Sequence, residues 1–176
     1  MIMPRGKELL LPVRPVFIWL SLAFALALNM IANMGLWGRA AWQPDVLAVV
    51  LVFWTVHQPR RIGVSIAFLF GLFMDVHQGA LLGQHALAYT VLSYLAIGIH
   101  RRLLWFTVPS QAAQVLPLFV LAHALAWLIR WLGDGGSPGW WALLAPLLEA
   151  LLWPVFSVVL LMPQRQAPDP DANRPL

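Results

Sequence analysis

The chain reads FMDVHQGALLGQHALAY over residues 73–89, where an acid, two histidines, two glutamines and two glycines interrupt sequence that is otherwise strongly apolar. The stretch joins two segments that are each apolar enough to lie in lipid. Ionisable groups within hydrocarbon are costly, and they are usually functional or paired with one another. We therefore expect this stretch to form a helix junction and to mark the functional end of the molecule.

The composition indicates an all-α integral membrane protein. The chain has 176 residues, of which 61% are hydrophobic and only 10% are charged, whereas a soluble domain is about 25% charged. The net charge of +4 comes from small basic groups at the ends of apolar runs, a pattern of topology signals and not of nucleic-acid binding. The absence of cysteine excludes disulfides and cysteine metal ligands.

Six apolar segments are predicted to be transmembrane helices, because only a helix satisfies its own backbone groups when lipid surrounds it. We expect a single six-helix domain over residues 1–163 and a disordered cytoplasmic tail over residues 164–176. The third segment is short for a span, so it either extends toward Gly83 or thins the bilayer locally. The predicted spans are Pro15 to Met34, Ala40 to His57, Ile62 to Val76, Leu81 to His100, Ser110 to Leu132 and Gly139 to Met162.

The basic residues predict the orientation of these spans. With the N-terminus inside, only Arg39 and Arg130 fall on the outer side. The positive-inside rule then predicts that both termini are cytoplasmic and that residues 73–89 lie at the outer side of a bacterial inner membrane. The cytoplasmic set is Arg5, Lys7, Arg14, Arg60, Arg61, Arg101, Arg102, Arg165 and Arg174.

Small residues recur every four positions along the third span, at Gly63, Ala67 and Gly71, and Asp75 continues the same face. Small side chains at this spacing let two helix backbones approach closely. We favour packing within the six-helix bundle for this face, and a surface for a partner protein is the alternative.

The polar residues that the spans place at similar depth predict an outer-side polar cluster. Asp75 lies near the end of its helix, where the dipole disfavours an anion, so it needs a donor or a proton. Candidate donors are the two histidines of the opening stretch, Arg130, and Asn29 or Asn33. We favour structural hydrogen bonds over proton transfer. The cluster comprises Asn29, Asn33, Asp45, Asp75, Gln84, His85, Tyr89 and Arg130, and it is expected to face the bundle interior or a water-filled cavity.

Two further features concern acids within the spans. Pro44 and Asp45 are typical of a helix entry, with the acid beside the positive end of the dipole. Glu149 lies about midway through the sixth span, between Pro146 and Pro154. Because a charge at that depth costs about 2.5–3.5 kcal/mol, Glu149 must be neutral or paired. We favour a structural hydrogen bond, with a carbonyl freed by a proline as its partner, over a proton relay.

No catalytic motif is present. The serines and threonines lack a G-x-S-x-G or S-x-x-K context, and neither a glycine-rich phosphate loop nor H-E-x-x-H occurs. His77 and His85 are eight residues apart across a turn, which is poor spacing for a metal site. We therefore expect no catalytic residue, no metal and no cofactor.

Four segments in this order resemble the MreD family of rod shape-determining proteins. They are Pro44-Asp45 before an apolar helix, the basic turn Gln58-Pro59-Arg60-Arg61, the segment Gly71-Leu72-Phe73-Met74-Asp75, and Gly79 through Tyr89. The resemblance implies a non-enzymatic subunit of the bacterial elongation machinery in the inner membrane. It implies binding to MreC, and joint work with MreB, RodA and penicillin-binding protein 2 in lateral peptidoglycan synthesis.

The same resemblance implies a fold similar to the six-helix S components of energy-coupling-factor vitamin transporters. The second hypothesis is therefore a membrane solute-binding subunit, with Asn33, Asp75 and His85 in one ligand pocket. We favour the scaffold, because the chain lacks long outer loops rich in polar residues. In the scaffold, Gly79 and Gly83 would let MreC approach closely at the outer ends of the third and fourth spans.

Overall fold

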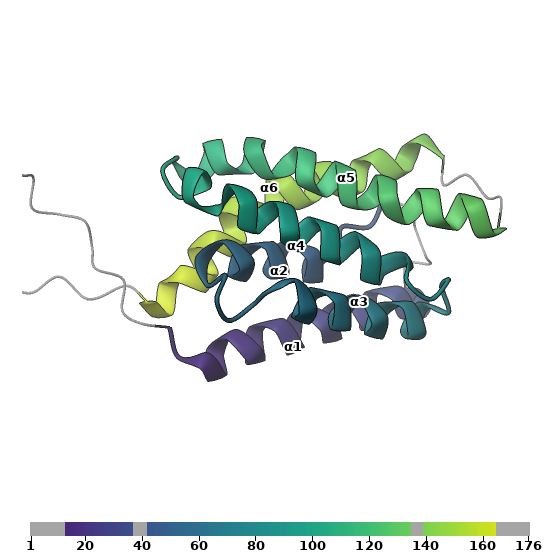
Figure 1. Cartoon of the computed structure of the whole chain (residues 1–176), viewed down its shortest axis with the longest axis horizontal. Coiled ribbons are helices and arrows are strands. Elements are labelled where there is room, and N and C mark those ends of the chain that lie inside the picture. Colours follow the sequence, from purple (N-terminus) through teal and green to yellow (C-terminus); the bar gives the residue numbers. More distant parts are fainter. Residues whose placement is uncertain (1–12, 37–41, 135–138, 165–176) are drawn as a thin grey trace, which may run out of the picture.

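The computed structural model describes residues 13–36, 42–134 and 139–164, and these residues form six α-helices (Figure 1). In this view α2 and α4 lie in the middle of the bundle, between α1 and α5. The helices are α1 (Pro15–Ile31), α2 (Val46–His57), α3 (Val64–Gln78), α4 (Gln84–Leu103), α5 (Val108–Asp134) and α6 (Leu144–Leu161). Three short turns flank them: the π-helical η1 (Ala32–Leu36) after α1, and the 3-10 helices η2 (Trp140–Leu143) and η3 (Met162–Gln164) on either side of α6.

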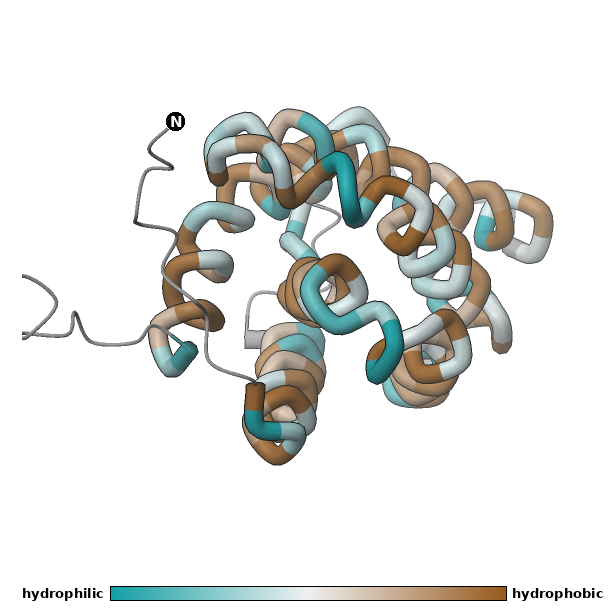
Figure 2. Tube along the Cα trace, turned by 60° about the vertical axis from the view of Figure 1, so that its left-hand side comes forward, coloured by the Kyte–Doolittle hydropathy of each residue, from teal (hydrophilic) through white to brown (hydrophobic). Residues whose placement is uncertain are grey.

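The all-helical fold with six helices confirms the predicted fold class and the predicted helices. Three helical segments are long and apolar enough to cross a membrane, namely Pro15–Met34, Val108–Gly133 and Trp140–Gln164. α2 and α3 are shorter apolar helices. Figure 2 shows apolar residues in brown along most of the helical tube, with hydrophilic residues in short teal stretches.

One predicted boundary is wrong, and one of the two alternatives left open for the third segment is excluded. The second helix does not include the residues from Trp42 to Asp45; it begins at Val46 with Asp45 as its N-cap. The third helix does not extend toward Gly83; it ends at Gln78, and Gly79 follows in the left-handed conformation. Of the tail predicted from residue 164, only Gln164 is described, and Arg39 and residues 165–176 lie outside the described residues.

α2 is the central helix of the bundle. Every residue from Leu47 to Val56 is buried, and the helix packs against α1, α4 and α6. A helix that is apolar on all sides is expected in such an environment. Its 12 residues span only about 18 Å, which is less than the roughly 30 Å of bilayer hydrocarbon. One end of α2 therefore lies within the bundle.

Polar pairs connect α2 to its neighbours. The indole nitrogen of Trp54 donates to Ser21 Oγ of α1 at 2.8 Å, and the hydroxyls of Thr55 and Ser93 of α4 are 2.9 Å apart. Each such pair between membrane helices stabilises the packing by about 0.6–2 kcal/mol. The pairs fix the rotation of a helix whose apolar surface would fit many orientations.

The small-residue face of α3 packs inside the bundle. Ala67 and Gly71 are buried, and a Cβ at Gly71 would overlap the backbone of His85 and Ala86 in α4. Gly63 is the N-cap of α3, and it lies before the helix and outside this contact. The close approach of α3 and α4 therefore depends on Gly71.

The described arginines divide between the two ends of the bundle. Arg60 and Arg61 follow α2, and Arg101 and Arg102 are in the last turn of α4. Arg61 donates to the carbonyl of Val13 at 3.4 Å, so this is also the end where α1 begins. Arg130 is near the end of α5, at the opposite end of the bundle.

We expect Gly71→Ala to destabilise the protein, because the added methyl group must push α4 away from α3. Overpacking of this kind costs about 1–3 kcal/mol. The matched control is Gly98→Ala in α4, where no atom lies within 4 Å of the added Cβ and alanine favours the helix by about 1 kcal/mol. Thermal unfolding in detergent should give a lower midpoint for Gly71→Ala only; equal midpoints would contradict the packing role.

Candidate functional site

The connection between α3 and α4 is a tight turn built on two glycines in the left-handed conformation. Gly79, with φ +59°, ends α3, and the amides of Gly79 and Ala80 donate to the carbonyls of Val76 at 3.3 Å and Asp75 at 3.0 Å. Gly83, with φ +102°, is the N-cap of α4. Residues with a Cβ rarely adopt this conformation, so the turn itself accounts for both glycines.

Asp75 caps the N-terminus of α4 from the preceding helix. Its side chain is buried, and it accepts hydrogen bonds from the backbone amides of Gly83 at 2.8 Å, His85 at 2.7 Å and Ala86 at 3.3 Å. An N-cap side chain normally makes such bonds within its own helix, but Gly83 has no side chain to do so. Asp75 lies near the negative end of the α3 dipole, which disfavours its charge. The positive end of the α4 dipole stabilises the same charge.

His85 is the one predicted donor that bonds Asp75. Its Nδ1 donates to Asp75 Oδ1 at 2.9 Å. His77 instead donates from Nε2 to the carbonyl of Met30 at 3.1 Å. Arg130 makes no described bond to Asp75 and lines a cavity nearby. The three backbone amides were not predicted, although a glycine at the N-cap position of α4 is the signal that another residue must cap the helix.

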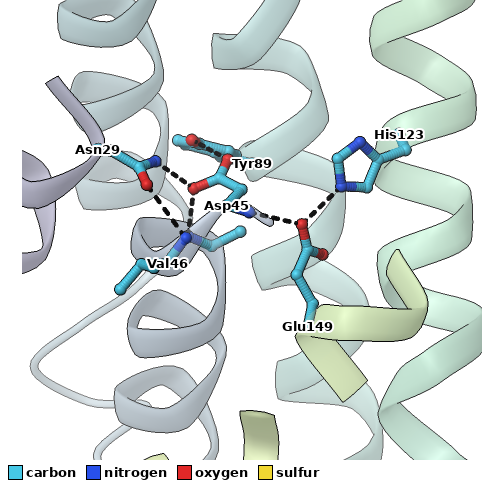
Figure 3. A network of polar contacts seen from close by, with 7 residues as sticks. Asn29, Asp45, Val46, Tyr89, His123 and Glu149 are labelled. Atoms are coloured by element: carbon cyan, nitrogen blue, oxygen red, sulfur yellow. Dashed lines mark hydrogen bonds and ion pairs between the residues drawn. The ribbon is translucent and has the colours of Figure 1, made fainter. Parts of the chain in front are cut away.

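A second polar network surrounds the N-terminus of α2 (Figure 3). Asp45 Oδ1 accepts from the amide of Ala48 at 2.9 Å and from Nδ2 of Asn29, and Oδ2 accepts from the Tyr89 hydroxyl. The amide of Val46 donates to Asn29 Oδ1 at 3.1 Å. Residues from α1 and α4 thus meet at the first turn of the central helix, and the helix entry predicted at Asp45 carries more contacts than a cap requires.

Glu149 joins this network from α6. Its side chain is fully buried, and Oε1 accepts from the backbone amide of Asp45 at 2.8 Å and from His123 Nε2 at 2.7 Å. His123 and the Asp45 amide are thus its partners, in place of the proline-freed carbonyl that we expected. His123 and Glu149 lie at similar distances before and after the connection at residues 135–138, and this symmetry in an antiparallel helix pair is the signal that could have predicted their contact.

These groups surround a polar cavity of about 290 Å³. Every member of the predicted outer-side polar cluster lines it except Asp75, which contacts it through His85. The sequence interpretation therefore brought together residues that share one site. It missed Gln43, His123 and Trp127, and it treated Glu149 as an isolated acid.

Within the described residues, no group of three or more histidines and acids could hold a metal ion. His77 and His85 point to different partners, Met30 and Asp75. The network around Asp45 and Glu149 can bind and orient polar groups, and its hydrogen bonds join α1, α2, α4, α5 and α6.

We expect Asp75→Ala to lower the free energy of unfolding, because it leaves buried amides at the start of α4 without an acceptor. A buried unsatisfied donor costs about 1–3 kcal/mol. Asp75→Asn should cost less, because its carbonyl oxygen still accepts. Ser65→Ala, at an exposed position on the same helix, is the control. Unfolding curves in detergent will show the order, and an Asp75→Ala variant as stable as the control would contradict the capping role.

Comparison with known proteins identifies the family. The protein-family model for rod shape-determining protein MreD matches residues 13–162. The rod shape-determining protein MreD of Haemophilus influenzae (strain ATCC 51907 / DSM 11121 / KW20 / Rd) is 27% identical over 142 residues, which cover 77% of this chain and 85% of that protein. No solved structure matches the chain. The chain therefore belongs to the MreD family of rod shape-determining membrane proteins.

Proposed function

We propose that the protein is a non-enzymatic scaffold subunit of the rod complex in the bacterial inner membrane. Its family is involved in the determination of rod cell shape, and this membership is the observation that carries the proposal. In the proposed complex the chain binds MreC directly, and MreB, RodA and penicillin-binding protein 2 belong to the wider assembly for lateral peptidoglycan synthesis.

In this proposal both termini are cytoplasmic and the polar cavity opens toward the outer side. Among the described residues, five arginines lie at the end where α1 begins, and Arg130 lies at the other end. The positive-inside rule supports this orientation. The outer end of the α3–α4 hairpin then faces the compartment where the cell wall grows.

The α3–α4 hairpin offers a surface for the partner. Phe73, Val76 and Leu82 are 61%, 74% and 75% exposed, and we call these three residues the hairpin surface. No atom lies within 4 Å of a Cβ placed on Gly79 or Gly83, so a partner helix has room beside the turn. In a membrane, helices associate through close van der Waals packing, and a hairpin held rigid by Asp75 provides a fixed surface for it.

A second candidate function is a solute-binding subunit, and the polar cavity is the observation in its favour. The scaffold is preferred because both oxygens of Asp45 already bond Asn29, Ala48 and Tyr89 within the protein. A water-soluble vitamin retained at one molecule per chain after purification would favour the solute-binding subunit over the scaffold.

We expect Val76→Trp or Leu82→Trp to reduce copurification with MreC at least severalfold, because a larger side chain holds the partner helix off the hairpin surface. Leu151→Trp is the matched control, since Leu151 is 71% exposed on α6. The measurement is the amount of MreC that a tagged protein retains from solubilised membranes.

The hairpin surface would be ruled out as the interface if both variants retained as much MreC as Leu151→Trp. The contact would then move to the exposed alanine face of α1, at Ala23 and Ala27. Equal membrane content of all variants is the check that insertion is unaffected.

A further inference from the structure

Two buried acceptor oxygens at the polar cavity have no hydrogen-bond partner among the described residues. They are Glu149 Oε2 and Gln43 Oε1, and both residues line the cavity. Figure 3 shows Oε2 of Glu149 directed away from the bond to His123. An unpaired oxygen away from water is unfavourable, above all on a carboxylate. Both unpaired atoms are acceptors, so an occupant that satisfies them must donate hydrogen bonds.

The charges around the cavity also favour a cationic donor. Asp45 and Glu149 are two acids on its wall, and Arg130 is an exposed cation at its edge. The oxygens of Asp45 and Oε1 of Glu149 already accept bonds from the protein. Glu149 Oε2 is therefore the carboxylate oxygen that lacks a donor, and Arg130 adds a cation to the lining of the same cavity.

An apolar groove adjoins the polar cavity. It encloses about 360 Å³ and shares Asn29, Gln43 and Pro44 with the cavity. The rest of its wall is apolar and comes from α1 and from the segment that enters α2, including Leu28 and Trp42. A polar cavity beside an apolar groove matches a molecule that has a charged head and a hydrocarbon chain.

We propose that this cavity binds the headgroup of an aminophospholipid. Its primary ammonium group donates to Glu149 Oε2 and Gln43 Oε1, its phosphate meets Arg130, and an acyl chain follows the groove past Leu28. The cavity volume is at the lower end of the roughly 300–1,000 Å³ of small-molecule sites, which suits a headgroup of this size. The site differs from the partner surface proposed above, because none of the three residues of the hairpin surface lines the cavity or the groove.

The chemistry distinguishes this headgroup from other common ones. A primary ammonium has three N–H donors, whereas the quaternary ammonium of a choline lipid has none. A glycerol headgroup can donate, but it brings a net negative charge next to two acids. The ammonium and phosphate together also occur in soluble molecules, so the lipid source has to be tested separately from the chemistry.

The test is a titration of the purified full-length protein in detergent with phosphatidylethanolamine, phosphatidylcholine and phosphatidylglycerol of identical acyl chains. Ligand that binds the native state raises its thermal midpoint. We expect phosphatidylethanolamine to bind about tenfold more tightly than either of the others, the difference that one charge-assisted hydrogen bond provides. Equal affinity for the ethanolamine and choline lipids would overturn the proposal.

Variants locate the binding. Arg130→Gln should weaken phosphatidylethanolamine binding severalfold, whereas Arg102→Gln, at an exposed position at the opposite end of the bundle, should not. Glu149→Gln should abolish the preference for ethanolamine over choline. If that variant fails to fold, Gln43→Leu tests the second acceptor and should reduce the same preference. Unchanged phosphatidylethanolamine affinity in Arg130→Gln, together with a preference for ethanolamine over choline that persists in Gln43→Leu, would overturn the assignment to this cavity.

A final arm separates the two sources of the headgroup. Glycerophosphoethanolamine has the same ammonium and phosphate but no acyl chains. If it binds far more weakly than the lipid, the groove contributes and the lipid assignment stands. If it binds as tightly, the ammonium site stands and the lipid source is overturned. The copurification of MreC is measured by a different experiment, so failure here leaves the scaffold proposal unaffected.

Discussion

The start of a helix inside the bundle is the constraint on which the rest of this structure depends. The first amides of an α-helix have no partner within the helix, and a buried amide left without an acceptor costs about 1–3 kcal/mol. α2 and α4 both begin at the polar end of the bundle, and their first amides donate to side chains. Asp45 and Asn29 accept from the first turn of α2, and Asp75 accepts from the first turn of α4.

Most of these acceptors come from a different helix than the one they cap, which makes capping a tertiary interaction. Asp75 belongs to α3 and serves α4, and Glu149 belongs to α6 and serves the entry to α2. The same carboxylates then take Tyr89, His85 and His123 as further donors. The hydrogen bonds that satisfy the first turns of α2 and α4 therefore connect the helices at one end of the bundle. The polar cavity lies among these hydrogen bonds.

The sequence was sufficient for the helices and for the location of the polar end. Long apolar runs predict helices, because a helix satisfies its own backbone hydrogen bonds in lipid. The distribution of arginines predicts which helix ends lie on the same side. The residues of the cluster from Asn29 to Arg130 could therefore be grouped by their depth alone. His85 was identified in the same way, as one of several candidate donors to Asp75.

The remaining features depend on packing that hydropathy does not report. Hydropathy alone extends the predicted second helix to before Pro44, whereas the entry signal at Pro44 and Asp45 agrees with the observed start at Val46, where Asp45 is the cap. Backbone amides have no signature in the sequence, so the donors to Asp75 were missed. The left-handed conformation of Gly79 and Gly83 was also missed, whereas the close approach of α3 and α4 at Gly71 agrees with the predicted small-residue face.

Residue-resolved amide hydrogen exchange of the protein in lipid nanodiscs tests the capping account most directly. The account predicts slow exchange at Ala48, His85 and Ala86, although each lies in the first turn of a helix, and faster exchange at Val64 and Ser65, where α3 begins without a side-chain cap. In Asp75→Ala, exchange should rise at Gly83, His85 and Ala86 while Ala48 stays slow. Unchanged protection at the start of α4 in that variant would show that burial alone protects these amides, and it would contradict the account.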